Sequence, residues 1–154
     1  MPTREETIRV LQTLNLPLDQ FAVCGGALMA EHGLRENPND IDLLVTKHLF
    51  DQINAVWEKR AHGSDKQIMT PYIEIGGITI EAFPSIDFVD CEKAELFIKR
   101  ADLRDGIQFV RLADMLDWKR LVLETRPKNH KREDHLRDVE LLEKATATDD
   151  LGVH

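Results

Sequence analysis

The sequence predicts an α/β protein: a small, mixed and twisted β-sheet flanked by helices, with a helical pair at the C-terminus. Three observations predict it. Short aliphatic runs alternate with amphipathic segments, Gly-Gly pairs mark turns at 25–26 and 76–77, and two helical patterns close the chain. The 154 residues are 42% hydrophobic and 31% charged, so we expect a single domain at 1–145 and a frayed polar tail at 146–154.

The first elements are a helix, a strand and a second helix. Apolar residues at helical spacing predict a helix over 4–14, and Thr3 with Glu6 has the pattern of a capping box. The apolar run 21–24 predicts a short buried strand that ends in a glycine turn. The residues of 27–32 favour a helix that follows the turn directly.

The middle of the chain predicts strand, helix and hairpin. Acidic and aliphatic residues alternate at the start of 40–45, which predicts a strand. Apolar residues recur every three or four positions in 48–60 and predict a helix with one buried face. Two β-branched runs, 68–75 and 78–83, are separated by Gly76-Gly77, which is typical of a two-residue hairpin turn.

The last third is less regular. Segment 84–105 fits strand, loop or helix in different parts, and its assignment stays open. Residues 107–110 predict a last strand, and apolar spacing predicts helices at 112–124 and 133–145.

Composition excludes several classes of function. The chain has 20 Lys and Arg against 28 Asp and Glu, a net charge of −8, which disfavours an extended nucleic-acid groove. It has two cysteines and no CxxC pair, so a zinc ribbon or a redox motif is not supported. No apolar stretch is long enough to span a membrane and no leader pattern opens the chain, so we expect a cytoplasmic protein. One basic segment, 126–137, could bind a small anion or could be a solvated corner between helices.

The most informative motif is Gly25-Gly26 followed, after thirteen residues, by Asp40-Ile41-Asp42-Leu43. Asp40 and Asp42 are two positions apart on a strand and therefore project from the same face. Two carboxylates at such a short distance repel each other unless a cation lies between them. Mg²⁺ prefers such hard oxygen ligands together with phosphates. A glycine turn at the start of a helix offers backbone N–H groups to those phosphates.

A third carboxylate would complete a two-metal arrangement for an in-line displacement. Glu81 is the first candidate, because it is an acid on a strand otherwise built for burial. Glu74 is the alternative, although its place near the hairpin turn also suits a solvent-facing residue. A dehalogenase-type phosphatase motif is disfavoured, because Leu44 stands where Thr or Val is required.

With these motifs, the chain resembles the minimal nucleotidyltransferases of the DNA polymerase β-like superfamily. Cys24-Gly25-Gly26 and Asp40-Ile41-Asp42-Leu43 match the family signature. The sequence around these motifs is similar to that of small stand-alone and AbiEii-type members. The segment from Leu112 to Lys119, with the Arg126-Pro127-Lys128 that follows, resembles the family's C-terminal pattern. Asn129 departs from it, because related chains often carry Asp there.

The resemblance implies a nucleotidyltransferase-type fold and a set of site residues. Gly25 and Gly26 would contact the phosphates of a nucleotide, and Asp40 and Asp42 would hold two Mg²⁺ ions, with Mn²⁺ as an alternative. Glu81 would be the third metal ligand and the base, although Asp is usual at that position. Two cations complete the expected nucleotide site: Lys119, which would approach the triphosphate or be a plain surface lysine, and Arg35, which would contact phosphate or cap its own loop.

The implied activity is transfer of a nucleoside monophosphate from an NTP, ATP being the first expectation, to a hydroxyl of a small molecule or protein, with release of pyrophosphate. The alternative is a catalytically weak nucleotide- or partner-binding module of the same fold, such as an antitoxin. Under either hypothesis the chain could form a homodimer or bind a toxin partner.

Overall fold

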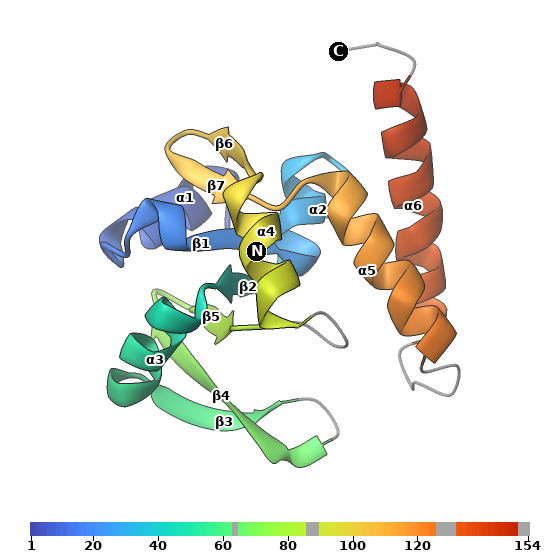
Figure 1. Ribbon diagram of the computed structural model, residues 1–154. Coiled ribbons are helices and arrows are strands. Elements are labelled where there is room, and N and C mark those ends of the chain that lie inside the picture. The colour runs from blue at the N-terminus through green and yellow to red at the C-terminus, as the bar shows by residue number, and fades with distance from the viewer. Residues whose placement is uncertain (63–64, 86–89, 126–131, 151–154) are drawn as a thin grey trace.

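The computed structural model describes residues 1–62, 65–85, 90–125 and 132–150. Within them lies one open, mixed seven-stranded sheet in the order β3-β4-β5-β2-β1-β7-β6, so β2 is the central strand (Figure 1). The strands are β1 (Phe21–Cys24), β2 (Asp40–Val45), β3 (Glu58–His62), β4 (Asp65–Ile75), β5 (Ile78–Phe83), β6 (Asp102–Arg104) and β7 (Ile107–Phe109). The α/β class with a mixed sheet is therefore confirmed.

Six α-helices accompany this sheet within the described ranges. They are α1 (Arg4–Thr13), α2 (Gly25–Glu31), α3 (Lys47–Val56), α4 (Cys91–Lys99), α5 (Leu112–Thr125) and α6 (Arg132–Asp150). The two last helices contact each other along one side of the molecule, which confirms the C-terminal helical pair (Figure 1). Thr3 caps α1 as predicted, because its side-chain oxygen accepts a hydrogen bond from the backbone N–H of Glu6.

The core lies against the central strands. Strand β2 runs antiparallel to β1 and parallel to β5, while β1 also pairs in parallel with β7. Ile41 and Leu43 of β2 are fully buried, as are Ile80 and Ala82 of β5. Because side chains alternate along a strand, the acidic residues between these positions are directed to the opposite face of the sheet.

The helix expected over 48–60 is wrong in its last part. Helix α3 ends at Val56, and residues 58–62 form β3, the edge strand that pairs with β4. Trp57 has extended backbone with ψ of 155°, although its N–H still bonds to the carbonyl of Ile53. Charged residues are common on sheet edges because water solvates their outer groups, so this segment could pair as a strand despite its composition.

The structure also assigns segment 84–105 and extends the last helix. The open segment 84–105 contains α4, whose first turn is capped by the Asp90 carboxylate on the N–H of Lys93, and the short strand β6. The expected helix end at residue 145 is wrong, because α6 continues to Asp150. Residues 128–151 contain neither glycine nor proline, so no helix-breaking residue ends α6 earlier.

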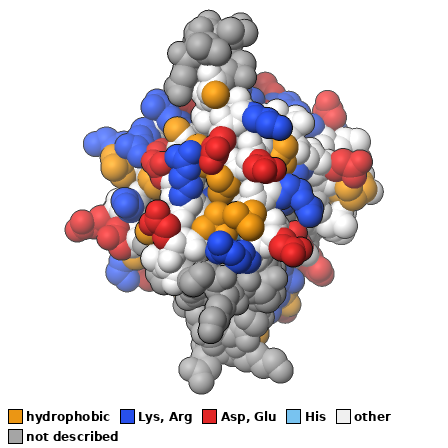
Figure 2. All heavy atoms as spheres, turned by 90° about the vertical axis from the view of Figure 1, so that its right-hand side faces the viewer, with side chains coloured by type: hydrophobic (Ala, Val, Ile, Leu, Met, Phe, Trp, Pro, Cys, Tyr) orange, Lys and Arg blue, Asp and Glu red, His pale blue; other side chains and the backbone are white. Residues whose placement is uncertain are grey.

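Figure 2 shows the face of the molecule on the side of α5 and α6. Over the described part of this face, Lys and Arg side chains alternate with Asp and Glu side chains around a small hydrophobic patch. The described helices include none that is both long enough and apolar enough to span a membrane.

Candidate functional site

The parallel pairing of β2 with β5 brings the predicted carboxylates together. Asp42 lies directly opposite Glu81 in this register, and Asp40 lies opposite Thr79. Since neighbouring strands are about 4.8 Å apart, the two acids opposite each other share one face of the sheet at close range. Glu74 pairs with Thr79 from β4 and is exposed, so it lies one strand further from β2 than Glu81 does.

The glycine turn lies against Asp42. Gly25 begins α2 with a φ of +65°, and a Cβ built on it would be 2.6 Å from Asp42 Oδ2. The preceding residue, Cys24, pairs with Asp42 across β1 and β2, and its Sγ donates to the Asp42 carbonyl oxygen at 3.4 Å. Burial, and secondarily the Asp42 charge, raises the pKa of the Cys24 thiol. Cys24 is therefore a protonated core residue beneath the turn.

Gly25→Ala is expected to lower the free energy of unfolding by about 1–2 kcal/mol, because alanine is strained at positive φ. Its methyl group would also displace the Asp42 carboxylate. Gly26→Ala is the matched control, since a Cβ there meets Arg35 and Pro38 no closer than 3.6 Å. Urea denaturation of both variants measures the difference. Equal stability of the two variants would contradict the close approach at Gly25.

Glu81 has partners on β3 and β4. Its side chain is buried; Oε1 accepts a hydrogen bond from the Arg60 guanidinium and Oε2 accepts one from the Thr70 hydroxyl at 3.0 Å. The hydrogen bond to Glu81 raises the pKa of Arg60, so this cation stays charged. The Glu81 carboxylate thus forms a buried ion pair that the sequence did not predict.

Asp40 and Asp42 form a pair of carboxylates that could hold a divalent cation. Asp40 and Asp42 share a face of the sheet; Asp40 is exposed and Asp42 is half-buried. Both can therefore bind Mg²⁺ while substrate phosphates and water supply its other ligands. Within the described ranges, no group of three or more His, Cys, Asp or Glu side chains is arranged to hold a metal ion. Glu81 is held by Arg60 and Thr70, and its expected role as a third metal ligand stays a prediction.

Lys119 projects from α5 into a buried polar cluster. Its Nζ is 3.1 Å from Asp138 Oδ2 and 3.0 Å from His135 Nδ1, and both partners lie on α6. All three side chains are less than a tenth exposed. Burial lowers the pKa of Lys119, although the Asp138 charge and hydrogen bond oppose that effect. Because the ammonium group can only donate, Nδ1 of His135 is the acceptor in this pair.

Arg35 joins the same cluster from the loop after α2. Its guanidinium forms an ion pair with Asp138 Oδ1, so one aspartate of α6 holds both cations expected to contact phosphate. The Arg35 side chain is 38% exposed, whereas that of Lys119 is 9% exposed. Arg35 also lies 3.6 Å from the position of a Cβ on Gly26, so it is next to the glycine turn.

Sequence reasoning missed Arg60, His135 and Asp138. Arg60 had been placed at the end of a helix, so its position on the sheet could not be anticipated. For the other two a signal existed: His135 and Asp138 lie seven and four residues before the buried Leu142 and therefore share its helix face. Polar residues at such core-facing positions indicate buried partners. The expected motif residues 126–129 lie outside the described part of the chain.

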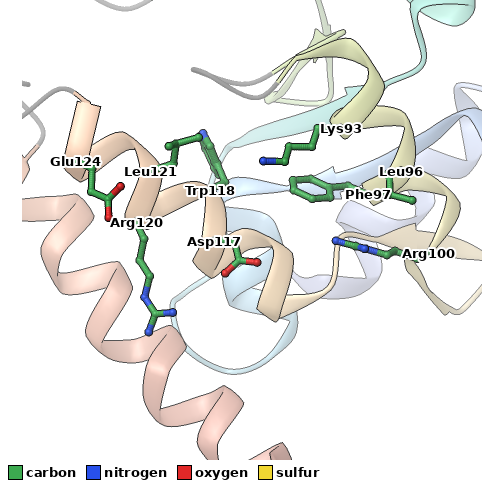
Figure 3. Close-up of a pocket in the computed structure, with 9 residues that line it drawn as sticks. All are labelled: Lys93, Leu96, Phe97, Arg100, Asp117, Trp118, Arg120, Leu121 and Glu124. Carbon is green, nitrogen blue, oxygen red and sulfur yellow. The ribbon is translucent and has the colours of Figure 1, made fainter.

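A separate groove lies between α4 and α5. Its volume is about 240 Å³, and Phe97 and Trp118 face each other inside it, with Lys93, Arg100 and Asp117 around them (Figure 3). Trp118 lines this groove while the next residue, Lys119, contacts α6. The Trp118 ring connects the groove with the Lys119 cluster, because Lys119 Nζ lies 5.0 Å from the centre of that ring.

Sequence and structural comparisons give no independent assignment of the site. The chain was compared with protein-family models, with curated proteins and with solved structures, and none of them matched.

Proposed function

We propose that the protein is a Mg²⁺-dependent nucleotidyltransferase that transfers a nucleoside monophosphate from an NTP to a hydroxyl of a small molecule or a protein. The observation that carries this proposal is the contact between the glycine turn and the acidic strand. Gly25 leaves no space for a side chain beside Asp42 Oδ2, and Asp40 shares the face of Asp42. The carboxylates that would bind the metal therefore lie beside the backbone N–H groups that would bind its phosphate ligand.

In the proposed reaction the acceptor hydroxyl oxygen attacks the α-phosphorus of the NTP. The bond from that phosphorus to the bridging oxygen breaks, pyrophosphate leaves with the bonding electrons, and the hydroxyl proton passes to a base or to water. Mg²⁺ bound by Asp40 and Asp42 would neutralise charge on the phosphates. The protein's own part is positioning and electrostatic stabilisation, because phosphoryl transfer needs little covalent chemistry from side chains.

The two expected phosphate-binding cations differ in accessibility. Lys119 is buried against Asp138 and His135, so it is not exposed for direct contact with a phosphate, although its charge interacts electrostatically with Asp42. Arg35 is more exposed and lies beside Gly26, which makes it the better candidate for direct contact with phosphate. Its guanidinium can keep the Asp138 ion pair and still offer further N–H donors.

Thermal shift with ATP, GTP, CTP and UTP, each with and without Mg²⁺, tests the proposal. A nucleotide at ten times its Kd should add about 1.4 kcal/mol, which raises the Tm by roughly 3–6 °C for a domain of this size. The shift should need Mg²⁺ and disappear in the Asp40→Ala/Asp42→Ala variant. The nucleotide that shifts the wild type then serves in assays of pyrophosphate release.

The outcomes separate the two candidate functions. Pyrophosphate release that depends on an added acceptor supports the transferase. A Mg²⁺-dependent shift without release under any condition would favour the binding module, and no shift with any nucleotide would contradict the nucleotide site itself.

A further inference from the structure

We propose that the guanidinium of Arg60 supplies the second positive charge of this site, and that the site binds a single divalent cation, at Asp40 and Asp42. Glu81 and Thr70 would then be positioning residues for Arg60 rather than metal ligands. This inference rests on the proposed function.

The sheet register places these residues in one row. Arg60 of β3 lies opposite Thr70 of β4, and two residues further along β4 Tyr72 lies opposite Glu81 of β5. Glu81 in turn lies opposite Asp42 of β2. Paired residues and residues two apart share a face, so the row runs across four strands from the sheet edge to the aspartates.

The carboxylate of Glu81 is arranged as an anchor for a cation of the protein itself. One of its oxygens accepts from Arg60 and the other from Thr70, and the side chain is 11% exposed. A buried carboxylate needs such partners, because an unpaired charge away from water is costly.

Arg60 is held in place and is still accessible. Its guanidinium lies 5.0 Å from the centre of the Tyr72 ring, its side chain is 38% exposed, and Asp40 acts on it electrostatically. A stacked and ion-paired guanidinium loses little entropy on binding, and its planar N–H groups suit phosphate oxygens. Arg60 offsets one of the three carboxylate charges, and one divalent ion then balances the remaining two.

The first test compares apo stability in the presence of a chelator. Glu81→Gln and Arg60→Met should each lower the Tm by roughly 3–8 °C, because each leaves a partly buried partner unpaired. Glu74→Gln is the matched control, an exposed acid on the same face that should change the Tm little. If Glu81 instead belonged to a set of mutually repelling metal ligands, its neutralisation would raise the apo Tm, and the proposal would be overturned.

The second test counts metal ions on the wild-type protein. Titration with Mn²⁺ in the presence of α,β-methylene-ATP, followed by electron paramagnetic resonance, should give one bound ion per chain. Two ions would overturn the inference and leave the proposed function intact. No nucleotide-dependent ion would contradict both, so the two failures are distinguishable.

The role of Arg60 toward phosphate has its own readout. Arg60→Met should weaken binding of α,β-methylene-ATP by about 10-fold or more while the Mn²⁺ stoichiometry stays at one, and Arg60→Lys should restore part of the affinity. A purely structural arginine would leave the affinity of the folded variant unchanged, and that result would refute the assignment.

Discussion

Replacing Asp42 by Asn is expected to reduce nucleotide transfer by at least about 10³-fold, equivalent to about 4 kcal/mol of transition-state stabilisation. Asp42 is the position at which three features meet. It pairs with Glu81 across the parallel strands, its carboxylate lies against Gly25, and it shares a face with Asp40. Asparagine keeps the size of the side chain but loses the negative charge that a divalent cation requires. Pyrophosphate release under single-turnover conditions measures the effect.

The fold should survive this change. One of two neighbouring like charges is removed, so the Tm of Asp42→Asn without metal should stay equal to that of the wild type or rise slightly. Asp51→Asn is the matched control, because this acid of α3 is 64% exposed and should affect neither quantity. Full transfer activity in folded Asp42→Asn would show that the acidic strand is not the metal site.

Asp138→Ala is expected to produce the largest loss of stability, about 3–5 kcal/mol. Asp138 is 2% exposed and holds two cations at once, Arg35 from the loop before β2 and Lys119 from α5. Its removal leaves the buried Lys119 ammonium without its counter-ion. Since a domain typically has 5–15 kcal/mol in total, the loss would take a large share of it. Urea denaturation at neutral pH measures the change.

A double substitution isolates the cause. Lys119→Met/Asp138→Leu removes both charges and fills the space with apolar groups, so it should be much more stable than Asp138→Ala. If the double variant is as unstable as the single one, the loss comes from packing around α6 rather than from an unpaired charge. Arg120→Met with Glu143→Leu, an ion pair whose side chains are half exposed, should cost little by comparison.

Several elements followed from local sequence. The helix that begins after Thr3 and the strand at 40–45 were predicted nearly to the residue, and so was the hairpin at Gly76-Gly77. Each depends on interactions between near neighbours: a cap, an alternation of side chains, or a turn that requires positive φ. Gly76 and Gly77 indeed have φ of 57° and 82°. Such signals need no knowledge of the rest of the fold.

The edge strand β3 could not be predicted in the same way. Its residues, Glu58–His62, have no β-branched or alternating pattern, and the apolar spacing before them continued a helix. They form a strand because they pair with the edge of β4 that β5 leaves free, and this pairing partner is not visible in their own sequence. The pairing of β3 with β4 places Arg60 on the sheet beside Glu81. The sequence-based prediction put Arg60 at the end of a helix because this pairing could not be seen from the local sequence.

The sequence by itself determined the α/β class, the strands that carry Asp40, Asp42 and Glu81, and the glycine turn before them. The tertiary structure alone decided which groups meet. The parallel register of β2 and β5 put Asp42 beside Glu81, the pairing of β3 with β4 gave Glu81 a guanidinium partner, and the packing of α6 on α5 buried Lys119 against Asp138. The physical reason is distance along the chain: ion pairs between residues tens of positions apart depend on strand order and helix packing, which no local pattern encodes.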